Sequence, residues 1–371
     1  MSDAVLVSAG EVSGDRMAAL VVQELTRRWP DLQFFGAGGG HLVRAGVEVR
    51  HTVDSLAVTG LTEVVSHIPA ALRMLADLAR QIERRRPALG LLVDYPGINL
   101  RLAWLLRRMG IPVLYLGAPQ RWAWLESHMS PLRRLDRLAV TLPFEEQWFR
   151  SRGVNATFVG HPVVDLFRPS PPDIAREALG LRADAAMVAL LPGSRHNEIQ
   201  RHMPPLTDAA RRLGLPAVVA AAPGCERLCQ RLAPNLRQAA MHSVLGAATV
   251  ALCASGSATL EVACAGVPAV VFYRVSPVTY AVARRMVQVP WIALPNLVLQ
   301  RPLLPELLQR DVCGERLATE ARRLLERSNG DRVREGLRQV RQRLGAPGVA
   351  GRVADLVASL LGRGGKMIGG R

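Results

Sequence analysis

A strand, a loop of small residues, a helix and a second strand follow one another in the second half of the chain. The apolar run Ala248–Cys253 predicts a buried parallel strand, after which Ser255-Gly256-Ser257 turns the chain into a helix. Gly266 and Pro268 mark the end of that helix, and Ala269–Tyr273 predicts the next strand. Such a βαβ unit places a helix N-terminus at the carboxyl end of a strand, where free N–H groups and the helix dipole suit a phosphate.

One acidic side chain lies in the first turns of that helix. Glu261, about one helical turn inside, is placed to accept hydrogen bonds from sugar hydroxyls. The alternative is an ordinary capped helix with a solvated Glu261. The loop alone supports both interpretations equally.

The beginning of the chain repeats this plan. Ala4–Ala9 predicts a buried strand, and a loop of small and polar residues leads from it into a helix. Gly10 and Gly14 let the backbone turn and approach a ligand. Three polar residues of this loop are candidates for binding hydroxyls: Glu11, Ser13 and Asp15. Helix capping is the alternative for the last two.

Two charged residues follow predicted strands in the two halves of the chain. Asp94 follows the strand Leu89–Val93, at the carboxyl end where ligands bind in open α/β sheets. It is therefore a candidate general base, although the residue alone favours a helix cap. Arg195 follows the strand Met187–Leu191 at a Gly193-Ser194 turn, where its guanidinium is placed to neutralise a diphosphate.

Aromatic residues are scarce, at 5% of the chain, yet Trp122 and Trp124 stand close together in a loop after the predicted strand Pro112–Leu116. They indicate either packing between domains or the wall of a sugar or acyl pocket. His161 follows the predicted strand Val154–Val159 and is either a ligand contact or a residue that packs in a turn.

The net charge of +16 comes almost entirely from arginine, because Lys366 is the only lysine. This charge predicts attraction to anionic partners such as nucleic acid, acidic lipid or phosphorylated metabolites. The arginines are dispersed, and no pattern of aromatic residues for base stacking accompanies them. We therefore expect no nucleic-acid partner.

Metal and nicotinamide sites are not indicated. The five cysteines lack the spacing of a metal site, so they read as reduced thiols of a cytoplasmic protein. The run from Gly36 to His41 has His41 where a dinucleotide fingerprint needs glycine, and it follows the second predicted strand instead of the first. We expect no cofactor and no metal.

No apolar stretch approaches the about 18 residues that a membrane span needs, and Met1 to Asp3 lead directly into a strand, so we expect neither a span nor a signal peptide. The helix predicted over Pro69–Arg86 has apolar residues at helical spacing and four arginines towards its end. It either packs on the core with a solvated end, which the pattern alone favours, or lies on an anionic bilayer surface.

The Pro-rich run Leu166–Pro172 predicts a linker, after which the α/β pattern starts again. We expect a Rossmann-like domain over residues 1–168 that binds an acceptor, and a second one over residues 173–345 that binds a UDP-sugar. A C-terminal helix and flexible tail over residues 346–371 would pack back on the first domain. Two α/β domains facing a cleft, each with ligand loops at strand ends, are typical of GT-B glycosyltransferases.

The motifs in this order resemble those of the lipid-A-disaccharide synthase family, from near the start to about Gln309. In the first half they are Ala9–Asp15, Leu56–Val64, Val93-Asp94 with Pro96 and Asn99, Trp122-Ala123-Trp124, Pro143-Phe144-Glu145 and Gly160-His161-Pro162. In the second half they are Leu191–Arg195 with Glu198, Ser255–Glu261, Tyr273-Arg274, Leu294-Pro295-Asn296, and Glu306 with Gln309.

The resemblance implies an inverting, metal-independent sugar transfer on a GT-B fold. UDP-2,3-diacylglucosamine would be the donor and 2,3-diacylglucosamine 1-phosphate the acceptor, giving a β-1,6-linked lipid A disaccharide 1-phosphate and UDP. The protein would be cytoplasmic and peripheral on the anionic surface of the inner membrane. A homodimer is one open alternative for its assembly.

Site residues follow from the resemblance position by position. Asp94 matches the family's catalytic aspartate, and Arg195 matches the arginine that stabilises the departing diphosphate. The matches to nucleotide-sugar-binding positions are Gly193, Ser194, Glu198, Ser255, Gly256, Ser257, Thr259, Glu261, Asn296 and Gln309. The matches to acceptor or cleft positions are Glu11, Ser13, Gly14, Asp15, Asn99, Trp122, Trp124 and His161.

The sequence departs from the family pattern in the acceptor half. Gly97 stands where the family usually has a second aspartate, and Ile98 where it has phenylalanine. Gly117–Arg121 replaces a Ser-Pro-Ser pattern, and Leu125-Glu126-Ser127 stands where an arginine is usual. UDP-sugar binding is therefore better supported than the acceptor. Three alternatives stay open: a glycosyltransferase with another acceptor, a UDP-sugar epimerase, and a non-catalytic basic module that binds nucleotides.

Overall fold

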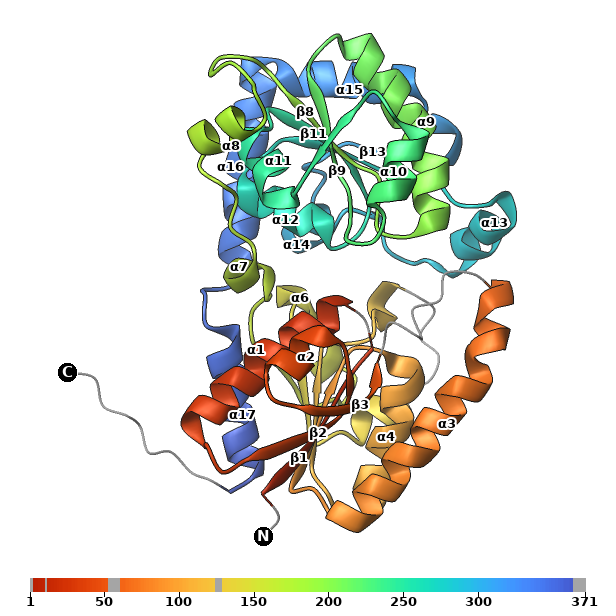
Figure 1. The fold of residues 1–371 in the computed structure, drawn as a ribbon, viewed down its shortest axis with the longest axis vertical. Coiled ribbons are helices and arrows are strands. Elements are labelled where there is room, and N and C mark those ends of the chain that lie inside the picture. Colours follow the sequence, from red (N-terminus) through yellow and green to blue (C-terminus); the bar gives the residue numbers. More distant parts are fainter. Residues whose placement is uncertain (1–2, 11, 53–60, 124–128, 363–371) are drawn as a thin grey trace, which may run out of the picture. The chain divides into compact units, whose positions relative to one another are not determined.

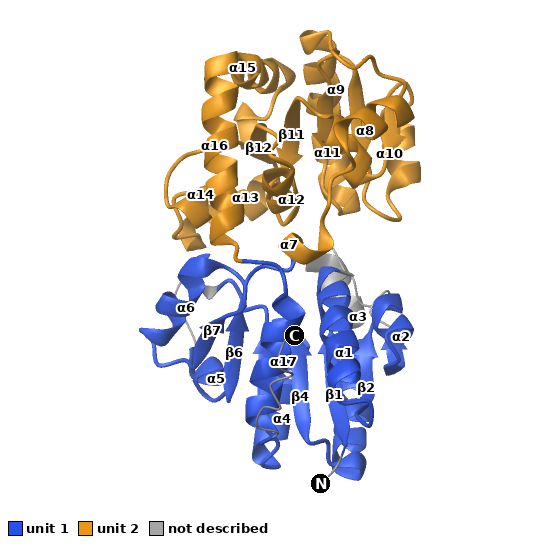
Figure 2. Ribbon diagram, turned by 90° about the vertical axis from the view of Figure 1, so that its left-hand side faces the viewer, with its two compact units in different colours: residues 1–162, 346–371 blue, residues 163–345 orange. Residues whose placement is uncertain are grey.

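The computed structural model describes residues 3–10, 12–52, 61–123 and 129–362. The chain forms two compact units (Figure 2). Unit 1 comprises Met1–Pro162 and Ala346–Arg371, and unit 2 comprises Val163–Gly345. The chain thus passes from one unit to the other just before the Pro-rich run that predicts a linker.

Unit 1 is built on a parallel sheet with the strand order β3-β2-β1-β4-β5-β6-β7. Its strands are β1 (Ala4–Ala9), β2 (Gln33–Gly38), β3 (Glu48–Thr52), β4 (Leu89–Val93), β5 (Val113–Leu116), β6 (Arg137–Val140) and β7 (Ala156–Phe158). The central strands β4 and β5 are buried along their whole length, as expected of a sheet covered by helices on both faces.

Helices connect these strands (Figure 1). They are α1 (Val12–Arg28), α2 (Gly40–Arg44), α3 (Leu61–Arg85), α4 (Pro96–Arg108), α5 (Ser130–Arg133), α6 (Pro143–Arg150) and the 3-10 turn η2 (Arg121–Ala123). The C-terminal helix α17 (Val349–Leu360) joins unit 1 by packing on α1, where Arg28 forms an ion pair with Asp355 at 2.6 Å.

Unit 2 repeats the architecture with the strand order β10-β9-β8-β11-β12-β13, again parallel. Its strands are β8 (Val188–Leu191), β9 (Ala217–Ala220), β10 (Arg237–Ala239), β11 (Val250–Ala254), β12 (Ala269–Tyr273) and β13 (Glu306–Leu308). Its helices are α7 (Val163–Leu166), α8 (Pro172–Ala178), α9 (His196–Leu213), α10 (Glu226–Leu232), α11 (Met241–Ala247), α12 (Ala258–Ala265), α13 (Pro277–Met286), α14 (Leu294–Leu299), η3 (Gln309–Asp311), α15 (Gly314–Leu325) and α16 (Arg327–Arg343).

Each sheet has one point at which the strand order reverses. In unit 1 the chain builds outward from β1 through β2 to β3 and then returns to place β4 on the other side of β1. In unit 2 the reversal lies between β8 and β11. Ligands of open α/β sheets bind at such switch points, outside the carboxyl ends of the strands.

The predicted elements are confirmed where the chain is strongly apolar, as the bounds Ala4–Ala9, Leu89–Val93 and Ala269–Tyr273 show. One prediction is corrected: the helix expected from Pro69 begins at Leu61, with Pro69 inside it. Three short strands that the apolar pattern does not indicate, β3, β10 and β13, are edge strands that carry polar residues.

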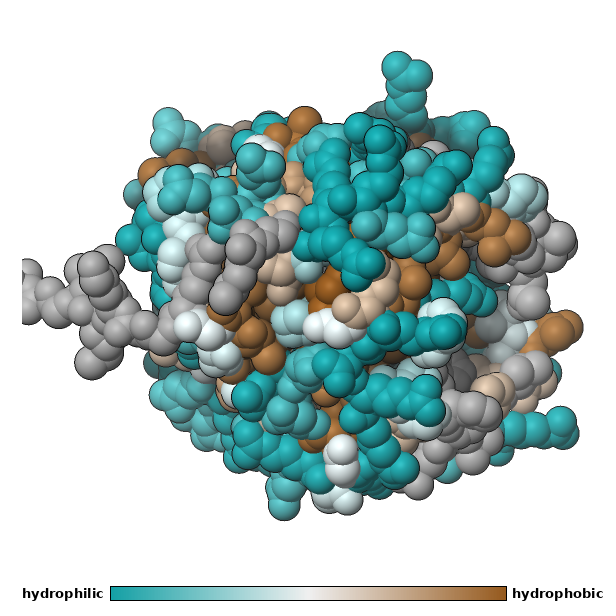
Figure 3. All heavy atoms as spheres, turned by 90° about the horizontal axis from the view of Figure 1, so that it is seen from below, coloured by the Kyte–Doolittle hydropathy of each residue, from teal (hydrophilic) through white to brown (hydrophobic). Residues whose placement is uncertain are grey.

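Hydrophilic residues cover most of the face drawn in Figure 3, and hydrophobic residues appear there in smaller areas. Within the residues that the structure describes, no helix has both the length and the apolar character needed to cross a bilayer.

Candidate active site

The switch point of unit 1 places Asp94 directly after β4, beside the loop that follows β1. Asp94 and Tyr95 both have a φ of 50°, in the left-handed region that residues other than glycine rarely adopt. Two such residues in succession cost about 1–3 kcal/mol each and persist only where their surroundings hold them. The carboxylate that the sequence predicts as the base therefore stands on a constrained turn.

Asn99 and Tyr115 hold this turn by binding the carbonyl oxygen of Asp94. The Asn99 amide donates to it at 2.8 Å and the Tyr115 hydroxyl at 2.6 Å. The same amide lies 3.0 Å from the Val93 carbonyl and 3.2 Å from that of Ser8, while its oxygen accepts from the Ser8 hydroxyl at 2.7 Å. Asn99 is completely buried, so it joins the ends of β1 and β4 and leaves no group for an acceptor.

Three glycines lie beside the turn, and one of them, Gly10, leaves no room for a side chain. A Cβ on Gly10 would lie 2.0 Å from Cγ of Tyr95, and one on Gly14 would lie 3.8 Å from Cβ of Asp94. Gly117, with a φ of 79°, is also adjacent to Asp94. Close approach to the turn therefore requires glycine at position 10, whereas a Cβ on Gly14 would make only ordinary van der Waals contact.

A second carboxylate, Glu145, lies near Asp94 at the end of β6. It accepts hydrogen bonds from Nε1 of Trp122 at 2.8 Å, and from the backbone N–H groups of Leu142 at 2.9 Å and Thr141 at 3.2 Å. Burial raises the pKa of Glu145 to about 7, and the charge of Asp94 acts in the same direction, although the three donors oppose both. Trp122 itself is buried, and its ring packs edge-on against Phe144.

Asp15 has a different role from the two that the sequence suggests. Its side chain is 3% exposed and accepts hydrogen bonds from the N–H groups of Gly39 at 2.6 Å and His41 at 2.9 Å. It therefore fastens the glycine-rich loop after β2, and it neither caps α1 nor faces solvent. Ser13, by contrast, is exposed, and His161 follows Gly160, whose φ is 85°. Glu11 and Trp124 lie outside the described residues.

In unit 2 the switch point brings together the loops that follow β8 and β11. Gly193 has a φ of 108°, and the next two residues, Ser194 and Arg195, are exposed at the start of α9. Arg195 contacts Glu198 at 3.1 Å, and the Tyr273 hydroxyl donates to the same carboxylate oxygen at 2.8 Å. Glu198 is thus anchored by Tyr273 and orients the arginine.

His202, on α9, holds the start of the loop after β8 and the start of the loop after β12. Its Nδ1 lies 2.7 Å from the carbonyl oxygen of Pro192, and its Nε2 lies 3.1 Å from the backbone nitrogen of Arg274. Burial lowers the pKa of His202, which favours the neutral ring. A neutral ring that donates from Nδ1 and accepts at Nε2 satisfies both contacts.

The loop after β11 leaves backbone and hydroxyl groups at the surface. Gly256 and Ser257 are exposed, whereas Thr259 is buried and donates its hydroxyl to the Gly256 carbonyl at 2.6 Å. Ser255 donates its hydroxyl to the carbonyl of Ile292 at 2.7 Å. Glu261 is partly buried in the first turn of α12. Thr259 and Ser255 therefore shape this loop, and Gly256 and Ser257 face the solvent.

Asn296 and Gln309 bind backbone and side-chain groups near the same edge of the sheet. Asn296 is completely buried; its amide donates to Glu306 at 2.7 Å and its oxygen accepts from the Leu304 N–H at 2.8 Å. The side-chain oxygen of Gln309 accepts a hydrogen bond from the backbone N–H of Val275 at 2.8 Å. The amide of Asn296 is fully used by partners within unit 2, and contact between Asn296 and the donor stays a prediction.

Sequence reasoning did not assign roles to Glu145, Tyr115, His202 and Tyr273. Tyr115 lies in β5, Glu145 in α6, His202 in α9 and Tyr273 at the end of β12, and each has a hydrogen-bond partner ten or more residues away in the sequence. Only Glu145 had a local signal, since a glutamate three residues after the start of a helix is typical of a capping box. Across the part of the chain that the structure describes, no cluster of three His, Cys, Asp or Glu side chains is arranged to bind a metal.

Solved structures share this two-unit architecture. A calicheamicin glycosyltransferase matches with a TM-score of 0.65 at 19% identity, covering 97% of this chain and 98% of the other. MurG of Acinetobacter baumannii matches with a TM-score of 0.59 at 17% identity, covering 96% and 99%. A UDP-GlcNAc 2-epimerase from Neisseria meningitidis has a TM-score of 0.64 at 10% identity, covering 96% and 100%. These likenesses confirm the predicted GT-B fold and do not distinguish among activities.

Sequence relatives are more specific. The family model described as lipid-A-disaccharide synthetase matches residues 5–346. The lipid-A-disaccharide synthase of Myxococcus xanthus is 43% identical over 373 residues, covering 96% of this chain and 97% of its own length. The enzyme of the same name from Geobacter metallireducens is 37% identical over 374 residues, covering 97% of each chain. The resemblance seen in the motifs therefore extends along nearly the whole sequence, and the chain belongs to the lipid-A-disaccharide synthase family.

Proposed function

We propose that this enzyme transfers the diacylglucosaminyl group of UDP-2,3-diacylglucosamine to the 6-hydroxyl of 2,3-diacylglucosamine 1-phosphate. The products are the β-1,6-linked lipid A disaccharide 1-phosphate and UDP. The observation that carries the proposal is the placement of one reactive side chain at each switch point. Asp94 follows β4 in unit 1, and Arg195 follows β8 in unit 2, in a chain that matches this family along its length.

In unit 1, Asp94 acts as the general base. Its carboxylate takes the proton of the acceptor 6-hydroxyl while that oxygen attacks the anomeric carbon of the donor. A base held within hydrogen-bonding reach supplies about 10²–10⁴-fold of rate enhancement. The left-handed turn held by Asn99 and Tyr115 keeps the carboxylate at the edge of the sheet, which is the positioning that such a step requires.

In unit 2, the bond from the anomeric carbon to the diphosphate oxygen breaks, and the charge that develops on UDP needs stabilisation. Arg195 carries a permanent positive charge and is exposed at the start of α9. The N–H groups around Gly256 and Ser257 provide further donors at the start of α12. Glu198, kept in place by Tyr273, holds the guanidinium ready, and the diphosphate takes its place as the anionic partner.

The loops that depart from the family pattern all lie in unit 1, the half expected to bind the acceptor. The identity of the acceptor is therefore proposed from the family and not from these loops. Gly97 has open space around it and could accommodate a larger residue. We also propose that the enzyme is peripheral on the inner membrane, since both substrates are acylated and the chain has a net charge of +16.

The test is a purified assay with both acylated substrates and without added metal, read by mass spectrometry for the tetraacyl disaccharide phosphate. Asp94→Asn should lower kcat by about 10²–10⁴-fold with little change in UDP affinity. Arg195→Ala should lower kcat and weaken UDP binding together, because it removes the charge from the diphosphate.

Asp31→Asn is the matched control, as Asp31 is an exposed aspartate of unit 1 outside the switch point. Release of UDP without disaccharide would indicate another acceptor. Chemistry confined to a single sugar would support an epimerase instead. Near-normal turnover in Asp94→Asn would refute the assignment of the base.

A further inference from the structure

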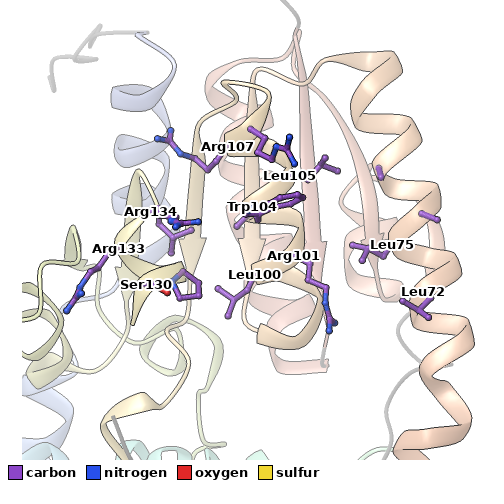
Figure 4. Close-up of a pocket in the computed structure, with 16 residues that line it drawn as sticks. Leu72, Leu75, Leu100, Arg101, Trp104, Leu105, Arg107, Ser130, Arg133 and Arg134 are labelled. Atoms are coloured by element: carbon purple, nitrogen blue, oxygen red, sulfur yellow. The ribbon is translucent and has the colours of Figure 1, made fainter. Parts of the chain in front are cut away.

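A groove on the outer face of unit 1 has no part in the site described above. It lies between α3, α4 and the segment around α5, and encloses about 1030 Å³. Figure 4 shows Leu72 and Leu75 projecting from α3 towards α4, which contributes Leu100, Trp104 and Leu105. Its floor is thus mainly hydrocarbon.

The groove leaves large apolar side chains in water. Leu72 is 57% exposed and Trp104 is 51% exposed. Each would be unremarkable alone, but here both line one hollow. Contiguous exposed apolar surface of this kind marks a binding site for an apolar partner.

Arginines rim the same groove. Arg101, Arg107, Arg108, Arg133 and Arg134 line it, and its described lining contains no Asp or Glu. Arg107 forms an ion pair with Asp136. Among the described residues, Arg108 and Arg134 have no acidic partner within 4.0 Å, and the Arg108 guanidinium lies 4.7 Å from the centre of the Trp104 ring. Both charges are therefore available to an anion beside the apolar floor.

We propose that this groove binds one acyl chain of an anionic phospholipid, with the phosphate on Arg108 and Arg134. A hydrocarbon chain matches the leucines and the Trp104 ring, and a phosphate matches guanidinium groups that have no carboxylate partner. Nucleic acid also offers phosphates, but its bases stack on aromatic rings, and this floor has several leucines with a single tryptophan. The combination of apolar hollow and basic rim favours a membrane lipid.

The groove is separate from the turn at Asp94 and Tyr95, the proposed catalytic turn, although α4 starts directly after that turn. Helix α4 begins at Pro96, beside Asp94, and ends at Arg108. The lining residues start at Leu100, and Asp94 is not among them. A lipid in the groove would hold α4, and with it the catalytic turn, at the bilayer where acylated substrates reside. This inference rests on the proposed peripheral location and specifies the surface responsible.

Vesicle flotation tests the charge and the apolar floor separately. Vesicles of phosphatidylcholine alone are compared with vesicles that also contain phosphatidylglycerol. The double variant Arg108→Gln/Arg134→Gln should lose about 25-fold of its binding to anionic vesicles, at roughly fivefold per charge. Trp104→Ser should lose about tenfold or more on both kinds of vesicle, as expected for an aromatic anchor.

Matched variants lie elsewhere on the molecule. Ile174→Ser removes an apolar residue that is 56% exposed on α8, and Arg227→Gln removes an exposed arginine of α10; both should bind like the unaltered protein. Val278, which is 76% exposed on α13, is the rival contact. If Val278→Ser abolished binding while the groove variants bound normally, the groove would not be the lipid site.

Brominated phosphatidylglycerol tests whether a chain enters the groove. Bromines along the acyl chain should quench the fluorescence that Trp104→Phe removes, whereas binding through the headgroup alone leaves that component unquenched and refutes an acyl-chain site. If an added acidic peptide, and not the lipid, quenched the Trp104 fluorescence, the proposal would also be overturned. Disaccharide synthesis with substrates dispersed in detergent is measured in parallel. If the groove variants synthesise disaccharide normally and bind vesicles as the unaltered protein does, only the lipid site is refuted. If the unaltered protein makes no disaccharide, only the proposed reaction is refuted.

Discussion

Replacing Asn99 with alanine tests whether a buried amide maintains the geometry of the catalytic turn. The side chain is 0% exposed and contacts Ser8, Val93 and Asp94. Its amide has two N–H groups, so it supplies at most two full hydrogen bonds, and the bond from the Ser8 hydroxyl makes a third. At about 0.5–1.5 kcal/mol for each bond lost, Asn99→Ala should destabilise unit 1 by roughly 2–4 kcal/mol.

The effect on catalysis should exceed what stability alone would cause. Without Asn99, the left-handed conformation of Asp94 and Tyr95 loses one of the two donors to the Asp94 carbonyl, and the turn can relax. A shift of about 1 Å in a catalytic group costs about 10²-fold in rate. We therefore expect kcat to fall by about that factor at a temperature where the variant is folded, with the KM for the donor unchanged because unit 2 is intact.

Urea unfolding and hydrogen exchange of the β1 and β4 amides measure the stability, and steady-state kinetics at saturating acceptor measure kcat. Asn155→Ala is the control. Asn155 also binds backbone, donating to the Asp136 carbonyl at 2.7 Å, but it precedes β7, an edge strand away from the switch point. A variant at Asn99 that kept both its unfolding midpoint and its kcat would show that the turn does not depend on this amide.

Three further outcomes are expected. Because the pKa of Glu145 is raised to about 7 in the folded protein, folding favours its protonated form, and the contribution of Glu145 to stability is full below about pH 4.5 and declines as pH rises towards 7. Urea titrations from pH 5 to 8 should show the free energy of unfolding declining by up to about 3 kcal/mol, and Glu145→Gln should abolish this decline. Parallel curves for the two proteins would contradict the assignment. Gly10→Ala should cost about 1–3 kcal/mol and lower kcat, because a Cβ there would meet the Tyr95 ring at 2.0 Å, whereas Gly97→Ala has open space and should be neutral in thermal melts and assays. His202→Leu should weaken UDP binding by about tenfold in calorimetry through the loss of two hydrogen bonds that set the loops, with turnover at saturating donor nearly preserved; unchanged affinity would show that the loops hold without it.

The central strands and the position of the site could be predicted from the sequence because both depend on local pattern. Apolar runs such as Leu89–Val93 identify strands that are buried on both faces, and the residue after such a strand must lie at the ligand-binding edge. Edge strands gave no such signal. Glu48–Thr52, for example, contains a single apolar residue, Val49, and becomes a strand by pairing with β2.

The pairing of loops could not be predicted in the same way. Strand order decides which strand ends are neighbours, and it is settled by packing between segments far apart in the chain. The strand that Asp94 follows is a neighbour of β1, and the strand that Arg195 follows is a neighbour of β11, only because the order reverses at those strands. The sequence could place each residue at an edge but could not say which other loop would face it.

Burial divides the polar residues of the family motifs into two groups, enclosed and exposed. Asp15, Asn99 and Asn296 are almost completely enclosed, with backbone groups as partners, so their loss should appear first as lost stability. Ser194 and Arg195 are exposed at a strand end, so their loss should spare the fold and reduce ligand binding or turnover. Both kinds of residue match family motifs, since a polar side chain that positions the site is as necessary as one that touches the substrate. A motif therefore indicates where the site lies, and only the enclosure of each side chain shows whether it supports that site or takes part in its chemistry.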